Sequence, residues 1–142
     1  MKKIILATVY CLLISLLVTS CKKETYTQHE PPVWQVDSEA GYHVNMTAVV
    51  TLSNDLIRGA DSNDKLAAFD SHGECRGVGK LFDDRFHISI KGVPEDEVSI
   101  HFMYYSARSK YLYRTKNSYP FDDNKILGTV DNPIVLDLEI LP

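Results

Sequence analysis

"HVNMTAVVTLS" (residues 43–53) decides the fold, because its apolar and polar side chains alternate. In a β-strand, successive side chains point to opposite faces, so a period of two marks a strand with one buried face. The apolar side chains of one face are Val44, Met46, Ala48, Val50 and Leu52. We therefore predict a strand here that packs on a core through that face.

The same period of two recurs along most of the remaining chain. Further short strands are predicted at 65–70, 74–82, 85–91, 98–107, 110–115 and 132–141. Turn residues separate them, as in Ser71-His72-Gly73 and the stretch 92–97. No stretch of useful length has the apolar period of a helix together with caps. The sequence predicts an all-β fold, an antiparallel β-sandwich of about seven to eight short strands, with a small β-barrel as the alternative.

The first 21 residues have the layout of an export signal. Lys2 and Lys3 precede an uncharged apolar run, residues 4–18, which is short for a helix that spans a bilayer. Residues 18–21 resemble the lipobox of bacterial lipoproteins. The resemblance implies a lipid on Cys21, cleavage before it, and acylation of the new N-terminus, for example with palmitate. We expect residues 1–20 to be a lipoprotein signal peptide; a plain secretory signal is the alternative.

The next residues are polar and lead into the strands. Residues 21–32, which end in two prolines, are predicted to be the lipidated Cys and a flexible tether, and 33–142 the β-sandwich domain. The loose lipobox and the "CKKE" start are similar to those of surface lipoproteins of Bacteroidetes-type bacteria. That resemblance implies a lipid-anchored position at the outer membrane, exposed at the cell surface. The first expected partner is thus the membrane, through the N-terminal lipid.

The charge of the chain argues against nucleic acid as a partner. Without Lys2 and Lys3, 13 of the 15 basic side chains remain against 19 acidic ones, a formal charge of −6. An acidic domain with no basic stripe repels nucleic acid and anionic lipid. We therefore expect the lipid, and not charge, to hold the protein at the membrane.

Cys75 is the one Cys outside the leader and the lipidation site. A nucleophilic Cys needs a lowered pKa, from a helix N-terminus or a firmly placed His. His72 lies three residues away, and odd offsets along a strand point to opposite faces. We therefore predict that Cys75 is a small core side chain in a strand, with Arg76 facing outward, and we expect no catalytic residue.

Two loops rich in Asp and Asn raise the question of a metal. Oxygen-rich loops can hold Ca²⁺, but Lys65 stands where an EF-hand loop needs another oxygen. Asp and Asn also favour turns for conformational reasons. We expect no metal and no cofactor; the candidate calcium ligands are Asp61, Asn63, Asp64, Asp122 and Asp123.

Tyrosines gather in the strands 98–107 and 110–115. Exposed aromatic rings beside Asp, Asn and Arg suit sugar binding, because flat faces stack on pyranose rings while polar neighbours bond the hydroxyls. The alternative is cross-strand aromatic packing, which stabilises any sheet. The candidate ligand-binding residues are Tyr105, Tyr111, Tyr113 and Arg108.

Several motifs together resemble a β-module of secreted and cell-surface proteins of Bacteroidetes-type bacteria. The likeness covers roughly residues 42–140, and Gly128 and Pro133 match its ending. The resemblance implies a β-sandwich of uncharacterised function, without known catalytic residues to transfer. The motifs are "DKLAAF", "ECRGVG", "VSIHFMYYSARSKYLY" and "FDDNKILGTVDNPIVL".

These observations favour a non-enzymatic interaction module that binds an extracellular glycan or a surface protein. The alternative is a structural subunit of an envelope assembly, in which exposed sheet edges accept strands from neighbours. A hydrolase or thiol enzyme is a third hypothesis. A structure separates these hypotheses by showing which polar and aromatic side chains stay accessible.

Overall fold

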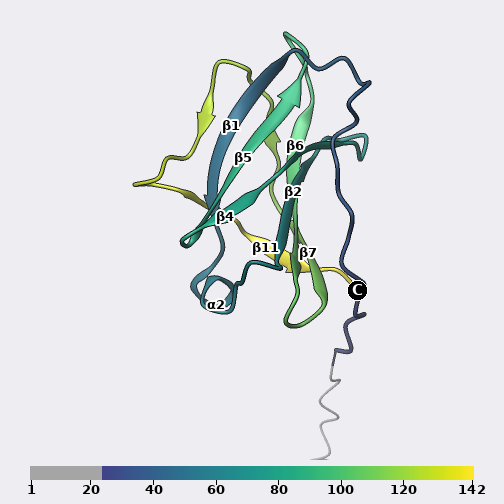
Figure 1. Cartoon of the computed structure of the whole chain (residues 1–142), viewed down its shortest axis with the longest axis vertical. Coiled ribbons are helices and arrows are strands. Elements are labelled where there is room, and N and C mark those ends of the chain that lie inside the picture. Colours follow the sequence, from purple (N-terminus) through teal and green to yellow (C-terminus); the bar gives the residue numbers. More distant parts are fainter. Residues whose placement is uncertain (1–23) are drawn as a thin grey trace, which may run out of the picture.

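The computed structural model describes residues 24–142, which form two β-sheets packed on each other (Figure 1). Sheet A contains, in order, β10 (Ile134–Val135), β1 (Val44–Thr51), β5 (Arg85–Gly92) and β4 (Lys80–Phe82), and β9 (Ile126–Leu127) also pairs with β1. Sheet B contains β11 (Leu138–Ile140), β7 (Tyr111–Thr115), β6 (Ser99–Ser106), β2 (Lys65–Phe69) and β3 (Cys75–Val78), and β8 (Tyr119–Pro120) pairs with β6. The prediction of a β-sandwich is confirmed, and the sheets do not close into a barrel.

The core lies between the two sheets, and the alternation in the sequence located it correctly. Side chains that point inward from both sheets are almost fully buried. From sheet A these include Met46, Ala48, Val50, Phe86, Ile88 and Ile90; from sheet B they include Leu66, Ala68, Ile100, Phe102 and Tyr104. The one helix in the described residues, the short α2 (Asn54–Ile57), follows Ser53 and was not predicted.

Two of the predicted strands are each divided between the sheets, which raises the number of strands above the prediction. The predicted strand 74–82 becomes β3 in sheet B and β4 in sheet A. Gly79 stands between them, and its N–H donates to the Leu66 carbonyl at 2.8 Å. The predicted strand 132–141 divides in the same way, with buried Leu136 between β10 and β11. In addition, β9 and β10 pair with β1 in parallel, so sheet A is not purely antiparallel.

Residues 26–34, called the strap below, lie along the outer face of sheet B. The His29 N–H donates to the Lys110 carbonyl at 2.8 Å, and the Tyr105 hydroxyl donates to the His29 carbonyl at 3.2 Å. At the far end of the strap, the ring of Trp34 meets that of Phe69 edge-on, with centroids 5.7 Å apart. Figure 1 shows this segment running down beside sheet B toward the turn between β6 and β7.

The strap corrects part of the predicted tether. Of residues 21–32, those from 26 onward pack on the domain, because backbone groups and rings of sheet B offer them partners. The predicted signal peptide and Cys21 lie outside the described residues. From residue 24 to the C-terminus, no helix is long and apolar enough to cross a bilayer.

Tyr105→Phe is expected to loosen the strap. The change removes the hydroxyl that donates to the His29 carbonyl, which lowers the free energy of unfolding by about 1 kcal/mol. Hydrogen exchange at the His29 amide should become faster, since its bond to Lys110 depends on the docked strap. In the control Tyr111→Phe, the lost hydroxyl makes no hydrogen bond within residues 24–142. Equal exchange at His29 in both variants would contradict this account.

Candidate functional site

The strap covers one part of the outer face of sheet B and leaves another part open. In the β6–β7 ladder Arg114 lies opposite Met103, and in the β7–β11 ladder it lies opposite Glu139. Opposed residues share a face, and Phe102 and Tyr104 point into the core, so Arg114 and Glu139 point away from sheet A. His101 is on the same outer face of β6. These side chains gather at the end of β6 remote from the β6–β7 turn.

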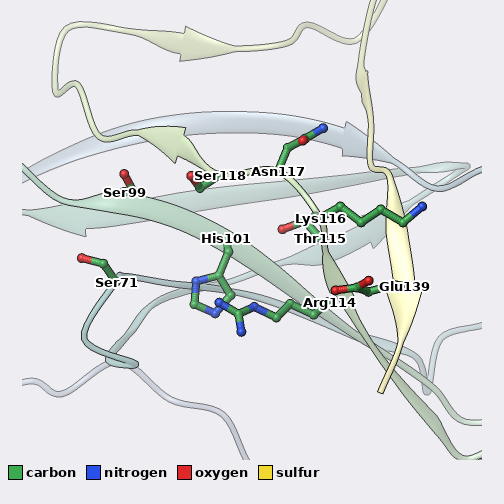
Figure 2. A pocket seen from close by; sticks show the side chains of 9 residues that line it. All are labelled: Ser71, Ser99, His101, Arg114, Thr115, Lys116, Asn117, Ser118 and Glu139. Atoms are coloured by element: carbon green, nitrogen blue, oxygen red, sulfur yellow. The ribbon is translucent and has the colours of Figure 1, made fainter. Parts of the chain in front are cut away.

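A hollow of about 260 Å³ opens at this place, and all nine of its lining residues are polar. Figure 2 shows them projecting from β6, β7 and β11, from the loop after β7 and from the β2–β3 turn. We call it the polar hollow. It is lined by Ser71, Ser99, His101, Arg114, Thr115, Lys116, Asn117, Ser118 and Glu139.

Most side-chain donors and acceptors that line the polar hollow have no hydrogen-bond partner within residues 24–142. Thr115 is the exception on the floor, where its hydroxyl accepts the Phe102 N–H at 2.9 Å. Lys116 is the exception at the rim, where its amine lies 3.1 Å from a carboxylate oxygen of Asp137. The side chain of Arg114 forms no hydrogen bond or ion pair in the described part of the chain, and that of Glu139 forms none either. The hollow therefore presents free donors and acceptors side by side.

His101 is held in place by a row of rings that begins in the strap. Its imidazole stacks on Phe69, with centroids 5.9 Å apart and planes at 26°, and Trp34 contacts Phe69 from the strap. Burial and then the nearby charge of Arg114 lower the pKa of His101, and the opposite effect of Asp70 is smaller. The imidazole is consequently neutral at neutral pH, with one nitrogen that donates and one that accepts.

The tyrosines predicted to bind a ligand do not form a site. Tyr105 is 1% exposed because the strap covers it, so its predicted role in stacking on a ligand is wrong. Tyr113 packs on the core residue Tyr104, with ring centroids 5.7 Å apart, as expected for the alternative of cross-strand packing. Tyr111 meets Tyr26 of the strap edge-on. Arg108 is exposed, but it lies in the β6–β7 turn, away from the polar hollow.

Cys75 and Arg76 have the opposite placement to the predicted one. Arg76 is 5% exposed, and its guanidinium lies 2.8 Å from carboxylate oxygens of both Asp70 and Asp96. Cys75 is half-buried, and burial raises the pKa of its thiol, which disfavours the nucleophilic thiolate. A hollow of about 200 Å³ adjoins the thiol, and the described residues that line it include no His. Alternation failed here because a β-bulge shifts the register between Ala68 and Phe69, so that no residue of β2 lies opposite Arg76.

The Asp and Asn residues considered for calcium have other partners in the structure. The Asp64 carboxylate is 8% exposed and accepts hydrogen bonds from the Tyr104 hydroxyl and the Ala107 N–H. Asp61 accepts the N–H of Asn63 in an Asx-type turn. Asp122 likewise accepts the N–H two residues further on, while Asp123 accepts from a neighbouring amide side chain. Across residues 24–142, no three His, Cys, Asp or Glu side chains are grouped so as to hold a metal ion.

The polar hollow was not predicted, although part of the signal was present. Alternation places His101 and Arg114 on outward positions of their strands. Which outward positions stay open depends on the strap, and the strap was interpreted as a tether. The approach of Ser71 and Glu139 depends on pairings between distant segments.

Comparisons with protein-family models, with characterised proteins and with solved structures found no match to this chain. The resemblance to a Bacteroidetes-type surface module therefore stays a prediction. The interpretation of the site depends on its own geometry and chemistry.

Proposed function

We propose that this protein is a lipid-anchored, non-catalytic module at the surface of the bacterial outer membrane, where it binds an extracellular glycan in the polar hollow. The observation that carries the proposal is the group of free hydrogen-bonding side chains around one open hollow. Sugars offer many hydroxyls, each of which both donates and accepts. A surface with free donors beside free acceptors matches that pattern.

The strap supports an orientation in which the hollow faces away from the membrane. His29 is eight positions after Cys21 in the sequence, a span of about 28 Å at most. His29 is bonded to Lys110, so a lipid on Cys21 keeps the β6–β7 turn near the bilayer. Ser99 lies seven residues along β6 from Ser106, about 23 Å further away. The hollow is then accessible to polymers outside the cell.

The chemistry of the hollow favours a glycan over a protein partner. Protein interfaces depend on large buried anchors, most often Trp, Tyr and Arg in desolvated pockets. The hollow contains no aliphatic side chain, and its one ring, His101, is already stacked on Phe69. Strand addition by a neighbouring subunit is also disfavoured, because the edge strands β3, β4, β10 and β11 have only four, three, two and three residues.

Arg114→Ala is expected to weaken glycan binding at least tenfold. The change removes a free guanidinium, and hydrogen bonds to charged groups contribute about 1.5–3 kcal/mol. Binding would be measured on arrays of bacterial and host polysaccharides, with urea unfolding as a check on folding. Since Arg114 is exposed and unpaired among the described residues, stability should change by less than about 0.5 kcal/mol.

The matched control is Arg108→Ala, which removes an exposed arginine from the opposite end of β6. It should leave glycan binding unchanged. Failure of the purified protein to bind any glycan would overturn the proposed function, as would equal affinity of the two variants.

A further inference from the structure

The charged residues of the polar hollow balance one another. Arg114 lies directly opposite Glu139 in the β7–β11 ladder, on the same face. Opposite charges in such positions commonly pair across the strands, yet these two form no ion pair in the described structure. The second cation, Lys116, is already neutralised by Asp137 at 3.1 Å. The hollow therefore offers a free cation and a free carboxylate together, and no net charge.

An anionic ligand fits this arrangement poorly. A carboxylate or sulfate bound by Arg114 would lie close to the Glu139 carboxylate, which repels it. His101 gives no compensating charge, because its imidazole is neutral at neutral pH. The whole chain is also acidic, so the surrounding field does not attract anions.

We propose, on the basis of the function proposed above, that the ligand is a neutral sugar bound through two adjacent hydroxyls between Arg114 and Glu139. Arg114 donates hydrogen bonds to the hydroxyl oxygens, and Glu139 accepts hydrogen bonds from the hydroxyl protons. Each hydroxyl therefore accepts one hydrogen bond and donates another. Asn117 and His101 each supply a donor and an acceptor for neighbouring hydroxyls. At about 260 Å³ the hollow is smaller than the pockets of drug-sized ligands, which suits a single sugar unit of a polymer.

Glu139→Gln separates a neutral ligand from an anionic one by the direction of its effect. If the ligand is a neutral sugar, the substitution replaces the charged acceptor of Glu139 by a weaker, neutral amide oxygen, and affinity should fall about five- to tenfold. For an anionic ligand, loss of the repelling carboxylate should raise affinity. Salt gives a second readout: binding of a neutral sugar should stay constant between roughly 0.05 and 0.5 M NaCl, whereas binding of an anion weakens as screening increases.

The experiment uses the full-length protein in detergent micelles against immobilised mannan, glucan and galactan, and against the acidic polymers polygalacturonate and chondroitin sulfate. The matched control is Asp131→Asn, which removes an exposed carboxylate outside the lining of the hollow and should leave affinity unchanged. Binding to a neutral polymer that Glu139→Gln weakens supports the inference. Binding to acidic polymers alone, strengthened by Glu139→Gln, overturns the inference and leaves the proposed function intact. Binding to no glycan overturns both.

Discussion

Asp70→Ala is expected to lower the free energy of unfolding by about 3–5 kcal/mol, because it leaves a buried guanidinium without one of its two counter-charges. The Asp70 side chain is 0% exposed. One oxygen lies 2.8 Å from Nε of Arg76, and the other accepts the N–H groups of His72 and Glu74 at 2.8 and 3.0 Å. Arg76 would then have Asp96 alone, and two backbone donors would lose their acceptor.

This effect should depend on pH in a direction that the structure determines. Burial by itself raises the pKa of Asp70, but the hydrogen bonds from Glu74, Arg76 and His72 together outweigh it and hold that pKa below its usual range. A lowered pKa in the folded state gives stability that is fully present above the unfolded value, near pH 4, and is lost as pH falls through the folded value. The difference between wild type and Asp70→Ala in urea unfolding should therefore shrink below about pH 4.

The control for Asp70 is the exposed pair between Lys116 and Asp137. Its charges lie 3.1 Å apart, against 2.8 Å in the buried pair, but both side chains are about half exposed. Asp137→Ala should cost less than about 1 kcal/mol, since water screens the pair and solvates the remaining amine. Equal losses for the two aspartates would show that the buried cluster does not act as a structural clamp between the β2–β3 turn and the loop after β5.

Gly77→Ala is expected to lower the free energy of unfolding by about 2–3 kcal/mol, through overpacking. Gly77 lies in β3 of sheet B, where that strand passes close to β5 of sheet A. An added Cβ would lie 2.4 Å from the carbonyl oxygen of Ser89 and 3.2 Å from Cγ1 of Ile88. Because the closer atom belongs to the backbone of a central strand, the two sheets must move apart to admit the methyl group.

Gly79→Ala is the matched control for Gly77. The three atoms nearest to its added Cβ all belong to Leu66 and lie 3.4 Å away, which is an ordinary contact. The substitution should be neutral or should stabilise the protein by up to about 1 kcal/mol, because alanine restricts the unfolded chain more than glycine does. Urea unfolding of both variants measures the difference. A similar loss at both positions would contradict the close approach of β3 to β5.

The sequence by itself determined which side chains form most of the core. Phe86, Ile88 and Ile90 alternate with polar residues, and all three are buried as predicted. The sandwich follows from the same pattern, since many short strands with one apolar face must pack in pairs of sheets. Alternation is a local property of the backbone, so neighbouring residues alone are enough to reveal it.

Only the tertiary structure decided which outward-facing residues are covered, and therefore where the candidate site lies. Tyr105 and His101 are both on the outer face of β6, yet the strap buries the first and leaves the second at the edge of the hollow. In the same way, alternation does not show that the chain changes sheets at Gly79, or that Arg76 turns inward to pair with Asp70 and Asp96. These outcomes depend on contacts between segments far apart in the chain, and a period of two contains no information about them.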